Sequence, residues 1–192
     1  MAGLVRIGIE PVVDGSLAED FYQLYLAAFE PLRTRAVARQ VLHRDEFLAE
    51  MVDPRVSKYV ARDDTGYAIG LSTMTRHLET VPWISPEYFA ARYPEHAERD
   101  AIFYIGFTLT RPGQRGPKLA AAMIDALVET LLPERAVVAY DICRYNDTRL
   151  RFGTNIASFF SRTADVTVEP VDAQTYYSAT FHGPRGATEP SS

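Results

Sequence analysis

One stretch of sequence decides the fold: AIFYIGFTLT (residues 101–110), then RPGQRGP (111–117), then KLAAAMIDALVETLL (118–132). The first part is almost continuously apolar, as in a strand that is covered on both faces. The second part is a short loop that contains Gly113 and Gly116, and the third has the composition of a strong helix. Together they predict a strand–loop–helix unit inside an α/β domain.

The loop of this unit is a candidate phosphate site. The first backbone N–H groups of a helix have no partner within the helix, and together with the helix dipole they attract anions. Arg115 and Lys118 add positive charge at this point, and Gly116 lets the backbone approach a ligand closely. On the loop alone, an ordinary β-loop-α connection that binds nothing is an equally good interpretation.

Before this unit the sequence predicts a strand, two helices and a strand hairpin. The apolar alternation in Val5–Val13 indicates a strand, and Ser16–Glu19 has the form of a capping box at the start of a helix. A second helix is predicted over Ala36–Met51. Two strands, Val56–Ala61 and Tyr67–Met74, flank a DDTG turn signal. An insertion rich in proline and aromatic residues follows at about 78–100, with a helix start at SPE (85–87).

After the unit the sequence predicts a buried strand, a helix and a closing pair of strands. These are expected over Ala136–Ile142, Thr148–Arg162, Val166–Val171 and Tyr176–Phe181. We expect residues 1–183 to form a single domain and residues 184–192 to be a disordered tail.

Composition limits the class of protein. The chain has 192 residues and a net charge of −5, which argues against a nucleic-acid binder. The single cysteine, Cys143, fits a reducing cytoplasm and a small buried thiol. No metal site is expected, because the four histidines lack metal-ligand spacing. No apolar run approaches the roughly 20 residues that span a membrane, so we expect a cytoplasmic protein without membrane contact.

The order of these elements resembles that of the GNAT superfamily of N-acetyltransferases. The family signature, Arg/Gln-x-x-Gly-x-Gly/Ala, lies between a strand and a helix, where this chain has PGQRGPKLA (112–120). Arg115 matches the first signature position and Ala120 the last, whereas Lys118 replaces the central glycine. The resemblance implies an α/β (α+β) fold with a mixed central sheet of about six to seven strands and helices on both faces, in the order β-α-α-β-β-β-α-β-α-β-β.

The resemblance also implies that acetyl-CoA or acyl-CoA is the co-substrate. Its pyrophosphate would lie on the segment formed by Gln114, Arg115, Gly116, Pro117, Lys118, Leu119 and Ala120. Its pantetheine arm would pair with the strand edge at Phe107, Thr108, Leu109 and Thr110, and would be oriented by Asn146. The family's general-acid tyrosine has no evident counterpart, because the following helix carries Phe159 and Phe160.

Acyl transfer to an amine needs a proton acceptor and a proton donor. Glu79 could be the base, and so could Asp141, which lies on an apolar predicted strand where a carboxylate must be paired or have a raised pKa. The ordinary alternative for Asp141 is a carboxylate that is satisfied by Arg144 or a neighbouring strand. Tyr104 and Tyr145 could replace the missing acid, although Tyr104 could equally be a core residue.

Trp83, Tyr88 and Phe89 form an aromatic group within the predicted insertion. They could line an acceptor pocket, or they could be a small hydrophobic cluster under a long loop.

Two functions remain open on this sequence. One is an acyl-CoA-dependent N-acyltransferase that moves an acetyl or acyl group to an amine of a small molecule or peptide by direct attack. The other is a non-catalytic protein of the same fold that binds acyl-CoA or a partner protein. A homodimer is possible in either case.

Overall fold

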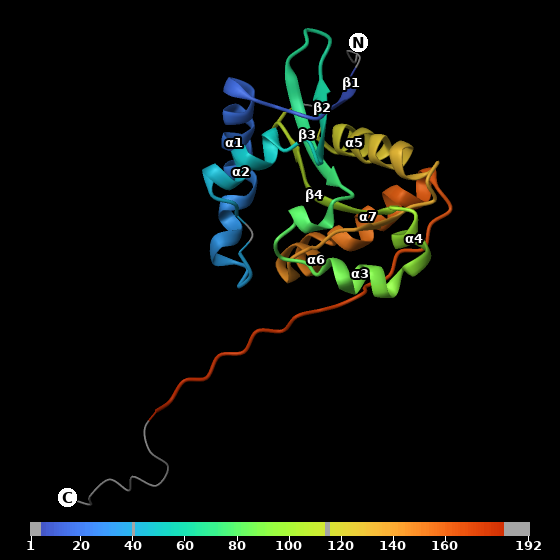
Figure 1. Cartoon of the computed structure of the whole chain (residues 1–192). Helices are drawn as coiled ribbons and strands as arrows, with labels where there is room; N and C mark the ends of the chain where they lie inside the picture. The colour runs from blue at the N-terminus through green and yellow to red at the C-terminus, as the bar shows by residue number, and fades with distance from the viewer. Residues whose placement is uncertain (1–4, 40, 114–115, 183–192) are drawn as a thin grey trace, which may run out of the picture.

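The computed structural model describes residues 5–39, 41–113 and 116–182. Its centre is a five-stranded sheet whose strands lie side by side in sequence order (Figure 1). Each pair of neighbours among the first four strands is antiparallel, and the fifth strand is parallel to the fourth. The strands are β1 (Arg6–Glu10), β2 (Val56–Arg62), β3 (Ala68–Thr75), β4 (Ile102–Thr110) and β5 (Val137–Ala139).

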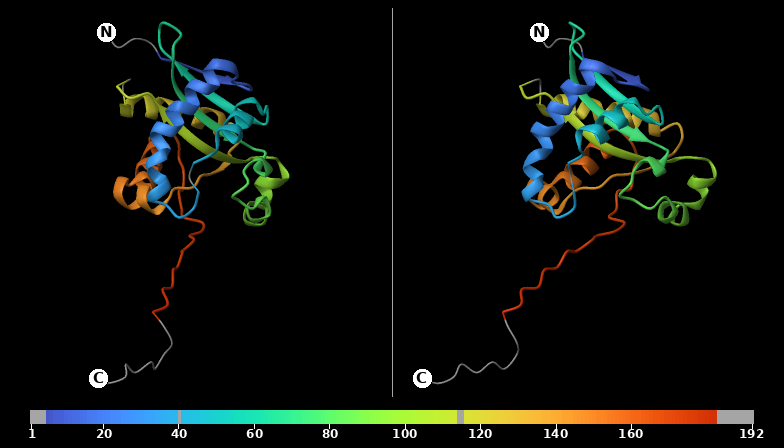
Figure 2. Two further views of the ribbon diagram at one scale, coloured as in Figure 1. Left: turned by 90° about the vertical axis from the view of Figure 1, so that its left-hand side faces the viewer. Right: turned by 60° about the vertical axis from the view of Figure 1, so that its left-hand side comes forward.

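Helices cover both faces of the sheet. Helices α1 and α2 lie against one face, and α5 and α7 lie on the other (Figures 1 and 2). The helices are α1 (Gly15–Phe29), α2 (Arg44–Val52), α3 (Pro86–Arg92), α4 (Pro94–Glu98), α5 (Gly116–Leu131), α6 (Arg144–Leu150) and α7 (Phe152–Thr163), with short 3-10 turns η1 (Glu30–Thr34) and η2 (Leu78–Thr80).

Two hydrophobic layers hold the helices to the sheet. On the α1 and α2 side, Phe47 packs in a buried cluster with Val60 and Phe107. On the α5 side, Leu127 packs with Tyr59 and other strand residues. Successive strand residues face opposite sides of a sheet. Cover on both sides therefore explains why β4 is apolar almost throughout, as the sequence predicted.

The predicted helix starts differ from the structure at two places. Helix α1 already begins at Gly15, with Asp14 as its N-cap residue, so the predicted capping box at Ser16 does not mark the helix start. Helix α2 begins only at Arg44, where Glu46 Oε2 accepts the backbone N–H of His43 at 2.7 Å. That side-chain contact fixes the start of α2 eight residues after the predicted start at residue 36.

The C-terminal part of the chain departs most from the prediction. The predicted helix over Thr148–Arg162 is divided into α6 and α7 by Arg151, which has a left-handed φ of 54°. The predicted strand Ala136–Ile142 pairs over only three residues.

The prediction of two closing strands, Val166–Val171 and Tyr176–Phe181, is wrong. No strand follows β5 within the described residues, so the described sheet has five strands and not six to seven. This segment instead bonds to side chains of α3. Tyr88 donates a hydrogen bond to the carbonyl oxygen of Val171 at 2.8 Å, and Arg92 pairs with Glu169 at 2.7 Å. Beyond this contact the chain runs away from the domain (Figure 1).

Candidate active site

Strands β4 and β5 pair at one end only. The parallel ladder joins Ile102, Phe103 and Tyr104 to the three residues of β5, whereas β4 continues to Thr110. On the β5 side, the described part of the chain provides no strand partner for β4 after Tyr104. Unpaired strand backbone is available to hydrogen-bond a ligand. The predicted pantetheine positions, 107–110, lie on this open part of β4.

The loop after β4 leads into the N-terminus of α5. Gly113 and Gly116 have positive φ angles of 77° and 39°, and a Cβ atom at either position would meet nothing within 4 Å. The first turn of α5 contains no acidic residue, and Lys118 is exposed. Gln114 and Arg115 lie outside the described residues. The first turn of α5 therefore carries no charge that would repel a phosphate.

A β-bulge interrupts β4 within the part of the strand that β5 leaves unpaired. Ser72 of β3 lies opposite Thr108, and Met74 lies opposite Ile105. Two residues of β4, at positions 106 and 107, therefore face the single Thr73. The extra residue reverses the side-chain alternation of β4, so that Ile105 packs on the α5 side while Phe107 packs on the α2 side.

Gly106 is the close-approach point of this bulge. A Cβ atom at Gly106 would lie 2.5 Å from Thr73 Oγ1 and 3.6 Å from Glu50 Oε1. The Thr73 side chain is 1% exposed. Its hydroxyl makes no hydrogen bond of ordinary geometry with any described residue, although it is near enough to act on the Glu50 carboxyl group. A side chain at this position would therefore have to displace the Thr73 hydroxyl or the bulge.

Glu50 reaches the bulge from the last turn of α2. Removal from water raises the pKa of its carboxyl group, while the Thr73 hydroxyl and the charge of Lys58 oppose this rise. Glu50 forms no ion pair with any residue that the structure describes. A carboxylate with a raised pKa and no bound cation is well suited to accept a proton.

Three further groups meet beside the β4–β5 opening. The Tyr104 hydroxyl donates a short hydrogen bond to Asp141 Oδ1, and Trp83 Nε1 donates to both the Tyr104 hydroxyl, at 3.1 Å, and Asp141 Oδ1, at 3.2 Å. Burial and the nearby Asp141 charge raise the pKa of Tyr104 well above its usual value. Asp141 itself is exposed and follows the end of β5, so the expectation of an acid on a buried strand is wrong.

A small cavity of about 20 Å³ connects the two groups of residues. Glu50, Thr73 and Gly106 line it together with Trp83 and Tyr104. This volume has room for roughly one water-sized group. The structure therefore brings Trp83 and Tyr104 to one cavity, with Asp141 bonded to both.

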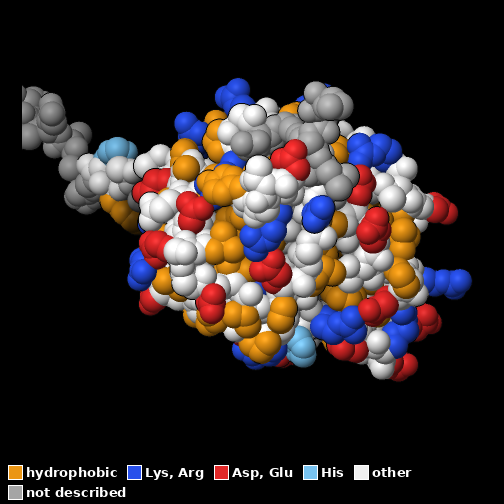
Figure 3. Space-filling view, turned by 90° about the horizontal axis from the view of Figure 1, so that it is seen from above, with side chains coloured by type: hydrophobic (Ala, Val, Ile, Leu, Met, Phe, Trp, Pro, Cys, Tyr) orange, Lys and Arg blue, Asp and Glu red, His pale blue; other side chains and the backbone are white. Residues whose placement is uncertain are grey.

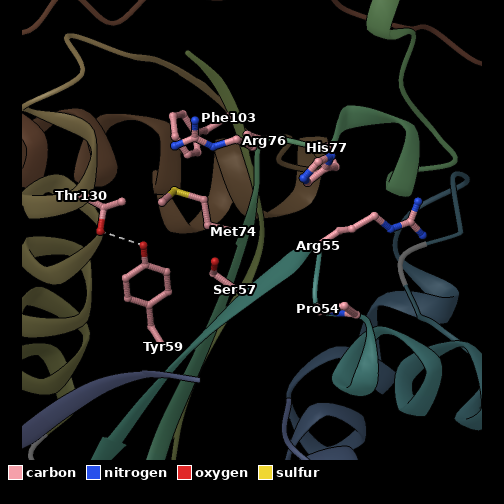
Figure 4. A pocket seen from close by; sticks show the side chains of 9 residues that line it. All are labelled: Pro54, Arg55, Ser57, Tyr59, Met74, Arg76, His77, Phe103 and Thr130. Carbon is pink, nitrogen blue, oxygen red and sulfur yellow. Dashed lines mark hydrogen bonds between the residues drawn. The ribbon is translucent and has the colours of Figure 1, made fainter. Parts of the chain in front are cut away.

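A larger cavity, of about 190 Å³, lies on the α5 side of the sheet (Figure 4). Arg55, Arg76, His77 and the Tyr59–Thr130 hydroxyl pair are among its lining residues, and the Arg55 guanidinium points away from the Tyr59–Thr130 pair. The Glu79 carboxylate lies 3.7 Å from Arg55 Nη1 and 3.5 Å from His77 Nδ1. The structure thus places the predicted base Glu79 with these residues and does not bring it to the bulge.

The other predicted residues have separate environments. Phe89 is buried against Leu78 and Val81, and the exposed Tyr88 contacts the C-terminal segment; neither lines the 20 Å³ cavity. Tyr145 and Asn146 lie in α6, where the guanidinium of Arg35 sits 4.9 Å from the Tyr145 ring centroid. In α5, Pro117 is exposed, Leu119 is buried and Ala120 is partly buried.

Sequence reasoning missed Glu50, Thr73 and Gly106. Glu50 falls on a helix among other charged residues, and nothing in its spacing separates it from a solvated acid. Gly106 carried a usable signal, because a glycine inside an apolar strand often marks a bulge or a close backbone approach.

Three further features concern the surface charges, the helix lengths and possible metal ligands. Seen from the end where the β2–β3 hairpin stands, basic and acidic side chains are interspersed with hydrophobic ones (Figure 3). No described helix is long and apolar enough to cross a membrane. Within the described ranges, no group of three or more His, Cys, Asp or Glu residues could hold a metal ion.

Comparisons by sequence and by structure give different results. No family model and no curated protein matches the chain in sequence. The ribosomal-protein-alanine N-acetyltransferase of Brucella melitensis biovar Abortus 2308 matches in structure with a TM-score of 0.50 and 14% identity, over 91% of this chain and 100% of its own.

Two aminoglycoside acetyltransferases are similar to the same degree. The meta-AAC0020 enzyme from an uncultured soil metagenomic sample, solved with trehalose, has a TM-score of 0.50 and 13% identity, over 92% of this chain and 97% of its own. AAC(6')-Ib, solved with coenzyme A and kanamycin, has a TM-score of 0.51 and 16% identity, over 82% and 83%. At such low identities the likeness establishes the fold. This chain has the fold of the GNAT N-acetyltransferases, as the order of its predicted elements indicated.

Proposed function

We propose that this chain is an acyl-CoA-dependent N-acyltransferase that transfers an acetyl or acyl group to an amine of a small molecule or peptide. The observation that carries the proposal is the position of Glu50, whose carboxylate lies over the β4 bulge next to the open edge of β4. A base, a bulged strand and an unpaired strand edge then meet at one place. The acyl-CoA supplies an activated acyl group, and an amine can attack it directly without a covalent enzyme intermediate.

The open edge and the helix start are suited to acyl-CoA. The backbone of residues 107–110 is available to pair with the pantetheine arm, because β5 diverges from β4 after Tyr104. The start of α5 presents backbone N–H groups, positive φ at Gly116 and no acidic residue in its first turn. These features fit a pyrophosphate. Lys118 is exposed and can contact a phosphate or turn away from it.

Glu50 is the group best placed to act as general base. An amine that enters as an ammonium ion must lose a proton before it can attack. The raised pKa of Glu50 makes this carboxylate a stronger proton acceptor than an ordinary exposed one. The bulge next to it supplies backbone groups outside the regular ladder, which can stabilise the negative charge that develops on the acyl oxygen.

Tyr104 is the best-placed proton donor. It lines the same cavity as Glu50, and its raised pKa keeps its hydroxyl protonated at neutral pH. Asp141 and Trp83 hold the hydroxyl in place. Protonation of the leaving sulfur by Tyr104, directly or through a water molecule, breaks the hydrogen bond to Asp141, and the raised pKa makes Tyr104 a weaker acid than an ordinary tyrosine. Phe159 and Phe160, which occupy the region expected to hold a tyrosine, offer no such proton.

The acceptor is proposed to enter between the first two helices and the loop that carries Trp83. The names of the similar structures include an aminoglycoside and a ribosomal protein as acceptor classes. An amine on a small molecule or on a peptide is consistent with both.

The proposal is tested by thiol release from acetyl-CoA with a panel of amines, in the parent and in Glu50→Gln. We expect Glu50→Gln to lower the rate by about 10²- to 10⁴-fold, the range for loss of a general base. Because the carboxylate is the active form and its pKa is raised, the parent rate should fall on acidification at a higher pH than an ordinary glutamate would give.

The matched control is Glu129→Gln, which changes an exposed acid on α5. Its rate should equal that of the parent. Tight binding of acetyl-CoA without thiol release above the buffer rate, for every amine, would contradict the enzymatic proposal and favour a non-catalytic binding protein.

A further inference from the structure

Lys58 of β2 is a fully buried charge without a carboxylate partner. Its side chain is 0% exposed. The ammonium group donates to the carbonyl oxygen of Asp53 at 2.6 Å and to that of Pro11 at 2.9 Å. It forms no ion pair with any residue that the structure describes, and the nearby Asp53 carboxylate is paired with Arg55 at 2.6 Å.

Such an arrangement is costly to maintain. Burial of an ammonium group disfavours its charged form, and the pKa of Lys58 is lowered for this reason, with the charges of Glu50 and Asp53 opposing the decrease. A methionine would fill similar space without this cost. The buried charge therefore calls for a role other than filling the core.

The two carbonyl groups identify what Lys58 connects. Asp53 is the C-cap residue of α2, and Pro11 follows β1. A second tie lies alongside, where the backbone N–H of Val13 donates to the carbonyl oxygen of Met51 at 2.8 Å. Lys58 thus fastens the end of α2 to the chain after β1, and Glu50 lies within the turn of α2 that is held in this way.

Lys58 also lies in one row with the candidate site. It is directly opposite Thr73 on β3, and Thr73 in turn faces Gly106 across the β4 bulge. Lys58, Thr73 and Gly106 are therefore neighbours across β2, β3 and β4, and the Glu50 carboxylate lies near Gly106.

We propose that Lys58 is a positioning residue, which fixes the last turn of α2 and thereby holds the Glu50 carboxylate over Thr73 and Gly106. Its effect on acyl transfer rests on the function proposed above, whereas its effect on Glu50 can be measured without any acceptor.

The charged and titratable groups around Glu50 determine the expected sign. Lys58 on β2 lowers the pKa of Glu50, Asp53 at the end of α2 raises it, and Glu50 in turn raises the pKa of Tyr25 on α1. Tyr104 on β4 lines the same cavity and is protonated at neutral pH. Lys58 is thus the cation that acts on Glu50, and its removal should raise the pKa of Glu50 further.

The test uses Lys58→Met and Lys58→Gln in the full chain. The Glu50 carboxyl carbon is followed by NMR in a pH titration, and its signal is identified by its loss in Glu50→Gln. We expect the midpoint in Lys58→Met to rise by about 1 unit, within the range for loss of a nearby opposite charge. Lys58→Gln removes the same charge but keeps one or two hydrogen bonds to the carbonyl groups, so it should fold even if Lys58→Met does not. If Lys58 acts through these ties, the midpoint should rise less in Lys58→Gln than in Lys58→Met. Equal shifts in the two variants would leave only a charge effect and would overturn the positioning role.

A purely structural role gives a different result. If either variant folds and Glu50 titrates as in the parent, the proposal is overturned, whatever stability has been lost. With acetyl-CoA and an active amine, the acidic limb of the rate profile should move upward by the same amount. If the parent acylates no amine but the midpoint shifts more in Lys58→Met than in Lys58→Gln, Lys58 positions Glu50 and the proposed function fails by itself.

Discussion

The two faces of the sheet hold their charges in different ways. On the α5 side, the Arg76 guanidinium is paired with two carboxylates, Glu134 at 2.6 Å and Asp100 at 3.4 Å. The α2 side has exposed ion pairs as well, Arg39 with Glu46 and Arg44 with Glu19. Nearer the sheet on that side, the Lys58 ammonium group donates to two carbonyl oxygens, and Glu50 forms no ion pair among the described residues. Paired charges neutralise each other, whereas the α2 side keeps a carboxylate that can still take up a proton.

The larger of the two cavities is not the one that holds the unpaired acid. The cavity on the α5 side, about 190 Å³, is much larger than the cavity of about 20 Å³ at the bulge. The smaller one combines an unpaired acid, a bulged strand and a tyrosine with a raised pKa. Titratable groups with shifted pKa values therefore indicate the candidate site better than cavity volume does.

The strongest test of this comparison is Gly106→Ala. The added Cβ atom would lie 2.5 Å from Thr73 Oγ1, so the Thr73 hydroxyl or the bulge must move. A displacement of about 1 Å can cost about 10²-fold in rate, and we expect at least that loss of thiol release. Gly8→Ala on β1 is the matched control, because a Cβ atom there meets nothing within 4 Å. Similar rates for both variants would remove the bulge from the site.

Binding of coenzyme A is tested separately by Gly116→Asp. The carboxylate would repel the pyrophosphate at the start of α5, and we expect binding to weaken by about 10- to 100-fold, measured by calorimetry. Gly66→Asp controls for backbone strain, because Gly66 also has a positive φ, 87°, but lies in the β2–β3 hairpin. Equal affinities for the two variants would place the pyrophosphate elsewhere.

A smaller effect is expected from the Tyr104–Asp141 contact. Asp141→Asn weakens the acceptor that holds the Tyr104 hydroxyl, so thiol release should slow by about 10-fold. Tyr145→Phe should change the rate little, because the ring that stacks under Arg35 is kept. Identical rates for the two variants would exclude Asp141 from the mechanism.

The smallest effect is expected on the α5 side. Arg76 pairs with Asp100 and Glu134 and lies over the Phe103 ring, with about a third of its side chain exposed. Arg76→Met should lower the free energy of unfolding by no more than about 1 kcal/mol, as measured by denaturant titration, with thiol release unchanged. A large loss of thiol release in a folded Arg76→Met variant would show that both faces of the sheet take part in the reaction.

The sequence predicted the elements whose signals are local. The continuous apolar run of β4, the DDTG turn between β2 and β3, and the serine cap of α3, where Ser85 Oγ accepts the N–H of Tyr88, all appear in the structure. Each depends on residues that are close in sequence, and their order was enough to indicate the GNAT fold.

The closing strands could not be settled in this way. Val166–Val171 and Tyr176–Phe181 have strand-like composition, but a strand exists only where another edge pairs with it. In the structure this segment bonds to Tyr88 and Arg92 of α3. Strand-like composition shows that a segment is able to form a strand, but whether it forms one depends on an available strand edge beside it.

In the candidate site, too, some features follow from the sequence and others only from the tertiary structure. By itself the sequence determined the strand–loop–helix unit with Gly116, the lone Cys143 and the acidic net charge. Only the tertiary structure brought Glu50 from α2 to Thr73 and Gly106 on two strands, and Tyr104 to Asp141 across the β4–β5 opening. The physical reason is that a pKa depends on burial and on charges nearby in space, and residues 50, 73 and 106 become neighbours only when the sheet and α2 pack together.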